Sequence, residues 1–211
     1  METHCLRHTE IPGSSRLFQD YVYHFDRLSE YYDHAPYDPG AYSAVAGEIQ
    51  YPDSRRAALV SALRRTNPNS RALASLAQPG TVAVVTGQQA GLFSGPAYTI
   101  YKALTAVRLA RELSTRGIPA VPVFWIATED HEKLEGNHTQ GVTSSHQAVT
   151  LRTEGAGTAN QPVGTIALPS PPVEALLTAL EGFPHGGEIG NLVREAYPQG
   201  ATLGDGFRSL T

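Results

Sequence analysis

Hydrophobic positions form their clearest pattern in the middle of the chain. Residues 81–86 are a short β-branched run bounded by glycines, which is typical of a strand buried on both faces. Residues 121–127 are a second apolar run of strand length. Between them, apolar side chains from Tyr101 to Leu113 form a broad face at helical spacing, and Gly117 is expected to end that helix. A strand, a loop, a helix and a strand in this order predict a βαβ unit with a right-handed crossover.

The start of the chain is predicted to be helical. Apolar residues recur at three- and four-residue steps over residues 16–32, and Ser14 or Ser15 can cap this helix. Residues 33–51, which are rich in Tyr, Pro and Gly, predict only a partly ordered connection.

Two further helices are expected before the first strand. One covers residues 53–65, and the other covers residues 70–77, where Pro79 and Gly80 stop it. The buried stripe of the longer helix is expected to consist of Ala58, Leu59, Ala62 and Leu63.

The composition changes after residue 139. Residues 140–211 are rich in glycine and proline and poor in charge, and residues 205–211 look like the start of a helix that does not continue. Within this segment we expect weak strands at 142–153 and 163–168 and short helices at 173–181 and 189–197. The chain is therefore divided into residues 1–139, with the helices and the βαβ unit, and residues 140–211, an insertion or connecting segment truncated at its end. The fold class is α/β, with a partial doubly wound parallel sheet.

Composition and charge narrow the function classes. The 211 residues carry 16 Lys and Arg against 20 Asp and Glu, a formal net charge of −4 without a basic stripe, so no nucleic-acid partner is expected. No apolar run approaches the roughly 20 residues that span a bilayer, and the start of the chain is not a signal peptide. The only cysteine, Cys5, excludes an internal disulfide framework. We expect a cytoplasmic protein without a membrane partner.

Candidate ligand chemistry follows the first strand, because ligands of open parallel sheets bind beyond the carboxyl ends of the strands. Residues 87–95 are predicted to form a loop there. Its glycines can adopt positive φ and let the backbone approach a ligand closely; they are Gly87, Gly91 and Gly95. Gln88 and Gln89 can both donate and accept hydrogen bonds.

The helix that begins near Pro96 adds to this loop. Its first amides and the positive end of its dipole suit a phosphate or a carboxylate, and Lys102 lies about two turns into it. The glycine spacing matches neither the dinucleotide fingerprint nor the Gly-Lys-Ser/Thr phosphate loop. A glycine loop that only turns the chain, with Lys102 in solvent, is therefore the alternative.

Acidic and imidazole side chains follow the second strand. Glu129, Asp130 and His131 come directly after it, and such neighbours shift one another's pKa values as acid–base catalysis requires. If the two strands are neighbours in the sheet, this loop and the glycine loop share one crevice. A solvated acidic loop is the alternative.

A metal site is a further hypothesis for the same segment. His131 and Glu135 would lie on one face of a helix, and His138 could add a third ligand, as in a metal-dependent hydrolase. The segment lacks the second histidine of the zincin motif, and we expect no metal in the protein itself.

Two long motifs carry a family resemblance. Residues 85–103, Val-Thr-Gly-Gln-Gln-Ala-Gly-Leu-Phe-Ser-Gly-Pro-Ala-Tyr-Thr-Ile-Tyr-Lys-Ala, closely resemble the signature of the bacillithiol biosynthesis cysteine-adding enzymes. Residues 122–131, followed by Glu135, Asn137 and His138, are similar to a second part of that family's pattern, and residues 15–21 are similar to its start.

The resemblance implies a fold and a reaction. The fold would be a Rossmann-like core related to class I aminoacyl-tRNA synthetases. The reaction would be that of a ligase, in which the carboxyl of cysteine is joined to the amine of glucosaminyl-malate through an amide bond. ATP or another adenine nucleotide would be the cofactor.

The resemblance also assigns roles to three sets of residues. The nucleotide would be held by Gly87, Gln88, Gln89, Gly91, Gly95, Tyr98 and Lys102. The attacking amine would be oriented or deprotonated by Glu129, Asp130 and His131. The substrates would contact Trp125, Asn137 and His138.

The chain departs from the family in length and at two positions. Family members are more than twice as long, with a second half of the core and a coiled coil that supports dimerisation, so a homodimer is expected only for a full-length form. This chain is expected to be an N-terminal fragment that can be inactive alone. Glu132 stands where the family has Asp, and Gly136 replaces an aliphatic residue. A non-catalytic remnant that binds a nucleotide or another ligand is the alternative function.

Overall fold

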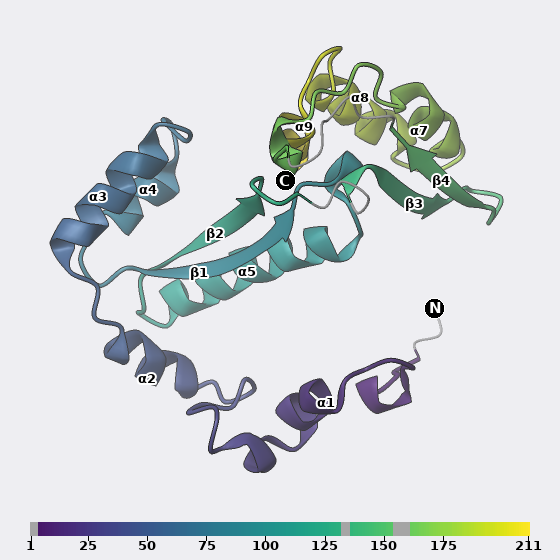
Figure 1. Ribbon diagram of the computed structural model, residues 1–211. Coiled ribbons are helices and arrows are strands. Elements are labelled where there is room, and N and C mark those ends of the chain that lie inside the picture. The colour runs from purple at the N-terminus through teal and green to yellow at the C-terminus, as the bar shows by residue number, and fades with distance from the viewer. Residues whose placement is uncertain (1–3, 132–135, 154–160) are drawn as a thin grey trace.

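A parallel pair of strands forms the centre of the fold. The structure is a computed structural model that describes residues 4–131, 136–153 and 161–211. Strand β1 (Val82–Gln89) pairs in parallel with β2 (Ala120–Ala127), and the last residues of the two strands, Gln89 and Ala127, are partners. Helix α5 (Tyr98–Thr115) connects the strands and packs against both (Figure 1). The predicted βαβ unit and the α/β class are confirmed.

Strand β1 continues beyond the predicted run. Gly87, Gln88 and Gln89 pair with β2, so the expectation that they lie in a loop is wrong. Burial on both faces is also wrong, because Val85 is 63 % exposed. In the described sheet β2 is the neighbour of β1, which leaves the other edge of β1 unpaired.

Helix α5 buries a narrower face than its sequence predicts. Ala106, Ala110 and Leu113 are buried against the strands. Tyr101 and Leu104, which belong to the expected buried face, are 70 % and 58 % exposed. A sheet of two strands is too narrow to cover more than one stripe of the helix.

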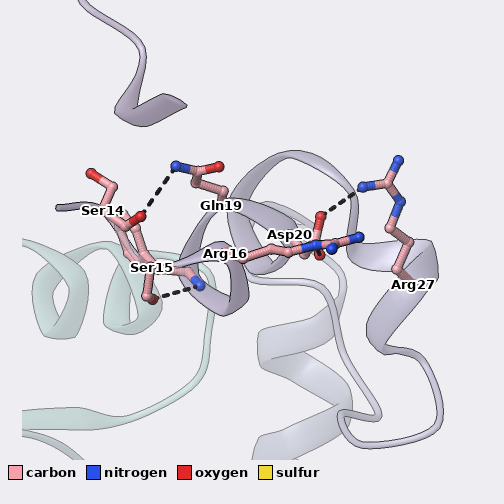
Figure 2. A network of polar contacts seen from close by, with 7 residues as sticks. Ser14, Ser15, Arg16, Gln19, Asp20 and Arg27 are labelled. Carbon is pink, nitrogen blue, oxygen red and sulfur yellow. Dashed lines mark hydrogen bonds and ion pairs between the residues drawn. The ribbon is translucent and has the colours of Figure 1, made fainter. Parts of the chain in front are cut away.

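The predicted helix over residues 16–32 is broken. Ser15 caps α1 (Arg16–Tyr23), and its hydroxyl accepts a hydrogen bond from the Phe18 N–H at 3.2 Å. The helix ends at His24, whose φ of −140° and ψ of 50° are not helical, and a 3₁₀ turn, η2 (Phe25–Leu28), follows. Arg27 Nη1 in η2 donates to Asp20 Oδ1 in α1 at 2.8 Å (Figure 2), so the ion pair joins the two pieces across the break.

Two more short elements lie in this N-terminal part. A 3₁₀ turn, η1 (His8–Glu10), precedes α1. Helix α2 (Ala41–Glu48) forms inside residues 33–51, for which the sequence predicted no element.

The next helices pack on the second strand. Helices α3 (Asp53–Arg64) and α4 (Arg71–Leu76) lie close to their predicted bounds. The predicted stripe of α3 is wrong, because Arg56 and Val60 are the buried residues of this helix. The Arg56 guanidinium donates to the carbonyl oxygens of Leu76 and Thr81 at 2.8 and 2.9 Å. These bonds turn the Arg56 face of α3 inward, and Val60 then packs beside Val121 of β2.

The C-terminal part begins with a hairpin. Strands β3 (His138–Val142) and β4 (Ala148–Arg152) pair in antiparallel where one weak strand was expected. Residues 163–168, expected to be a strand, contain a 3₁₀ turn, η4 (Val163–Thr165), and one isolated bridge from Ala167 to Thr202.

Three helices complete this part. Helices α7 (Val173–Ala179) and α8 (Gly186–Ala196) confirm the two short helices expected there. The last helix is α9 (Leu203–Leu210), which Thr202 caps, and it covers residues where the sequence predicted the start of a helix. No helix within the described ranges is long and apolar enough to cross a membrane.

The main core joins the C-terminal helices to the end of β1. Leu92 and Phe207 are fully buried in one cluster with Ala90, directly after β1, and Leu203 of α9. Because Gly206 has no side chain, the Tyr197 ring can pack into this cluster. A Cβ atom at Gly206 would lie 2.2 Å from Cε1 of Tyr197, so the Tyr197 ring occupies the space where a side chain would be.

Substitution of Gly206 tests this packing. We expect G206A to lower the free energy of unfolding by about 2–3 kcal/mol, the usual range for overpacking a closed core. The matched control is G187A in α8, where nothing lies within 4 Å of the added Cβ and the change should raise stability by up to about 1 kcal/mol. Urea denaturation of both variants measures the difference, and equal stability of the two would contradict the packing described.

Candidate functional site

A cavity of about 490 Å³ is lined by residues from the carboxyl end of β1, the start of α5 and the β3 hairpin. Several predicted binding residues line it, namely Gln88, Gln89, Gly91, Gly95, Tyr98 and His138. The other lining residues were not predicted from the sequence; they are Ala90, Pro96, Ala97, Gly136, Thr139 and Gln140. Ala90, Pro96 and Ala97 lie within the motif at residues 85–103, which was the signal for them, whereas Thr139 and Gln140 in the hairpin carry no recognisable spacing.

The turn between β1 and α5 forms one wall of the cavity. It contains the 3₁₀ turn η3 (Leu92–Ser94), and three consecutive residues in it have positive φ: Phe93 at 52°, Ser94 at 70° and Gly95 at 66°. Positive φ was expected at three glycines and is found at Gly95 alone among them. Gly91 has an extended φ of −140°, and what restricts it is space, because a Cβ there would lie 3.2 Å from the Gly95 Cα.

Lys102 does not line the cavity, but it contacts two residues that do, Gln88 and Tyr98. Its Nζ donates to the Gly87 carbonyl oxygen at 3.1 Å and to Gln88 Oε1 at 3.0 Å, and it lies 5.1 Å from the centre of the Tyr98 ring. The two acceptors are neutral, so these contacts orient the ammonium without cancelling its charge. The first turn of α5, with Pro96, Ala97 and Tyr98 at the cavity, adds the positive end of a helix dipole. The wall suits an anionic group.

Tyr197 lies behind the same turn, in the core rather than in the cavity. Its hydroxyl accepts a hydrogen bond from the backbone N–H of Phe93 at 3.0 Å, and the neighbouring Ser94 N–H also acts on the hydroxyl. The side chain is 3 % exposed, and its ring meets the Phe93 ring edge to face at 5.1 Å. Burial raises the pKa of Tyr197 to about 12, although the two N–H groups act to lower it. Sequence reasoning missed this residue because it lies 104 positions after Phe93.

The acidic segment after β2, Glu129 to His131, lies outside the lining of the cavity. Glu129 and His131 are exposed, and Asp130 Oδ1 accepts a hydrogen bond from the His131 N–H at 2.7 Å. The backbone of this segment is tied to η4, because the Asp130 carbonyl accepts from the Val163 N–H at 2.7 Å. Among the described residues that line the cavity, none of these three is included. Because β1 and β2 end side by side, the segment still leaves the same edge of the sheet as the turn.

The remaining predicted substrate residues lie around the cavity rather than in it. Trp125 of β2 is 59 % exposed and stands opposite Gly87 in the strand register. Asn137 is next to two lining residues, and its Oδ1 lies 3.2 Å from Nδ1 of His138 and 3.5 Å from Nη1 of Arg152.

The metal hypothesis depends on a residue that lies outside the described part of the chain. Glu135 falls in the gap between residues 131 and 136. Within the residues that are described, no three His, Cys, Asp or Glu side chains gather in a metal-binding group.

Comparison with known proteins gives one consistent family. The whole chain, residues 1–211, matches the family model described as the N-terminal Rossmann-like domain of the bacillithiol biosynthesis protein BshC. Similar proteins of Solibacter usitatus and Koribacter versatilis, each named "Putative cysteine ligase BshC", are 49 % and 32 % identical to 100 % and 98 % of this chain. A protein of the same name from Salinibacter ruber is 34 % identical over 92 % of it. The chain spans about two fifths of the length of these relatives.

The raised pKa of Tyr197 predicts a pH dependence of stability. The ordinary value is 10.0 and the folded value is about 12, so the folded chain holds the phenol proton more tightly than the unfolded chain does. This contribution is complete below pH 10 and is lost as the pH rises through 12, by about 2 kcal/mol. Denaturation of the wild type and of Y197F from pH 9 to 12 should show the difference between them shrinking by that amount. A difference that stays constant with pH would contradict it.

Proposed function

We propose, because the chain belongs to the BshC family of bacillithiol biosynthesis, that it supplies the nucleotide-holding and acid–base parts of a cysteine ligase. The fold is the N-terminal Rossmann-like domain of that family. The ligase reaction would join the carboxyl of cysteine to the amine of glucosaminyl-malate. The product is an amide, so a carbon–nitrogen bond forms and one carboxylate oxygen of cysteine leaves.

Two chemical demands follow from this reaction. A carboxylate resists attack by an amine, and ATP or another adenine nucleotide would supply the activation of its leaving oxygen. The amine is a nucleophile only after it has lost a proton, so a basic side chain must accept that proton. The protein must therefore hold a polyphosphate and place a base beside the amine.

The observation that carries the proposal is the cavity at the end of β1. Its wall combines the Gly91–Gly95 turn with the first turn of α5, and the charge of Lys102 lies against two lining residues, Gln88 and Tyr98. Backbone amides at a helix start together with one ammonium group are the chemistry that binds phosphate oxygens. The cavity volume of about 490 Å³ is in the range of small-molecule sites.

The base is proposed to come from the acidic segment. Glu129, Asp130 and His131 leave the sheet at the same edge as the turn, and the Asp130 carboxylate lies against the backbone of His131. His131 is exposed and free to approach a substrate, and we propose that it accepts the amine proton while the two carboxylates orient the amine. His138, on the cavity wall, would contact the substrates together with Asn137 and Trp125.

The wider setting follows from the family. The partners would be small molecules, cysteine and glucosaminyl-malate, and the protein would act in the cytoplasm. A homodimer is proposed only for a protein of the relatives' full length. A binding function without catalysis is the second candidate, because Glu129, Asp130 and His131 are not among the described residues that line the cavity.

Removal of the Lys102 charge tests the nucleotide site. We expect K102M to weaken ATP binding to this chain about tenfold or more, because a charge-assisted hydrogen bond to phosphate contributes roughly 1.5–3 kcal/mol. The control is R108M, which removes the same charge from the exposed side of α5. Titration calorimetry compares both with the wild type. Equal weakening by the two variants contradicts a specific role for Lys102, and a wild type that binds no ATP contradicts the proposed function.

Loss of the base tests the ligase chemistry. In a protein of the relatives' full length, we expect H131A and D130A to lower the rate of amide formation by about 10²–10⁴-fold, the usual contribution of acid–base catalysis. The free energy of unfolding should change little for H131A, because its side chain is exposed. The control is H185A at the start of α8, an exposed histidine in another part of the fold. Normal turnover in H131A and D130A would contradict the assignment, and ATP binding without turnover in the wild type would support the binding function alone.

A further inference from the structure

The turn between β1 and α5 is strained by its own sequence. Phe93 and Ser94 are consecutive residues with side chains, and both have a left-handed backbone. The left-handed conformation costs roughly 1–2 kcal/mol for each such residue, so it persists only where the surroundings impose it. Within the turn, the Gly95 N–H donates to the Leu92 carbonyl oxygen at 2.9 Å, which closes η3 but gives the amides of Phe93 and Ser94 no acceptor.

Tyr197 supplies an acceptor for the Phe93 amide, and the Ser94 amide acts on the same hydroxyl. A buried N–H group without a partner would cost about 1–3 kcal/mol, and the Tyr197 hydroxyl meets both of these N–H groups. Two other contacts keep its ring in place. Phe93 packs against it edge to face, and Gly206 leaves it a slot in which any side chain would overlap it. The position of the hydroxyl is therefore set by α8 and α9.

The opposite side of the turn faces the cavity. Gly91 and Gly95 line it, whereas Phe93 and Ser94 do not. Any relaxation of Phe93 and Ser94 toward an ordinary backbone rotates the peptide groups that precede Gly95 and Pro96, and so moves the cavity wall. The Tyr197 hydroxyl thus adds a polar link between the C-terminal helices and the wall to the apolar packing of Leu92 on α9.

We propose that Tyr197 is a positioning residue of the ligand site: its hydroxyl holds the amides of Phe93 and Ser94 and thereby fixes the wall that receives an anionic ligand. The proposal rests on the proposed function, because it takes this cavity to be the nucleotide site. Tyr197 touches no ligand in this account. It acts through the backbone of the turn.

The variant Y197F separates the role of the hydroxyl in positioning the turn from the role of the ring in packing the core. It keeps the ring between Phe93 and Gly206 and removes only the hydroxyl, so the fold is expected to persist. The matched control is Y31F, the same change at a side chain that is 77 % exposed. Two quantities are measured on the full chain: amide hydrogen exchange without ligand, read residue by residue by NMR, and ATP affinity by calorimetry well below the unfolding temperature.

Exchange at Phe93 and Ser94 is expected to become at least tenfold faster in Y197F, while amides in the middle of α8, such as Val193, keep wild-type rates. ATP affinity is expected to fall about tenfold with unchanged stoichiometry. In Y31F both quantities stay at wild-type values. A hydroxyl that only stabilises the core would speed exchange throughout α8 and α9 alike and leave the affinity of the folded chain unchanged.

Three results would overturn the proposal or its premise, and they are distinguishable. Wild-type exchange at Phe93 and Ser94 in Y197F shows that Tyr197 does not hold the turn. Fast exchange with wild-type ATP affinity shows that the turn is held but does not control the site. A wild-type chain that binds no ATP overturns the proposed function, and the exchange comparison still decides whether Tyr197 holds the turn.

Discussion

The packing of the C-terminal helices on the turn after β1 is the interaction on which the rest of the structure depends. Ala90 and Leu92, directly after the strand, are fully buried in the same cluster as Phe207 of α9. A two-stranded parallel sheet with one crossover helix does not enclose a core by itself, since both its faces and its edges need cover. This cluster gives the carboxyl end of the sheet that cover. It also determines where a ligand can lie, because the cavity opens on the other side of the same turn.

Local patterns predicted the elements whose signals lie within a few residues. The apolar runs at β1 and β2 and the periodicity of α5 identified the βαβ unit, and Ser15 was correctly expected as a cap of α1. The buried face of a helix and the residue at which a helix ends were less predictable. The face of α3 is set by hydrogen bonds from Arg56 to the carbonyl groups of Leu76 and Thr81, which lie 20 and 25 positions away. No periodicity within α3 contains that information.

The candidate site likewise has one part that local sequence predicted and another part that it did not. The glycine-rich turn, the two glutamines and Tyr98 follow one another in the chain and line one cavity, and Lys102 reaches it only through its bond to Gln88. The roles of Glu129, Asp130 and His131 remain predictions, since these residues share the sheet edge with the cavity but do not line it. Tyr197 and the β3 hairpin reach the site by tertiary packing, over separations of tens of residues. The sequence predicted positive φ at three glycines, whereas the structure shows it at one of them, Gly95, and at Phe93 and Ser94, in a turn whose Phe93 N–H donates to the distant Tyr197 hydroxyl.

The single tryptophan of the chain has a consequence for solution experiments. Trp125 is 59 % exposed on β2, and its strand partner Gly87 provides the carbonyl oxygen that Lys102 binds. Its indole emission therefore comes from one, largely solvent-exposed position on β2. In the strand register this position is paired with Gly87, next to the Lys102 ammonium. Fluorescence of the unlabelled protein thus reports on the end of the sheet where the cavity opens, without a background from any other indole.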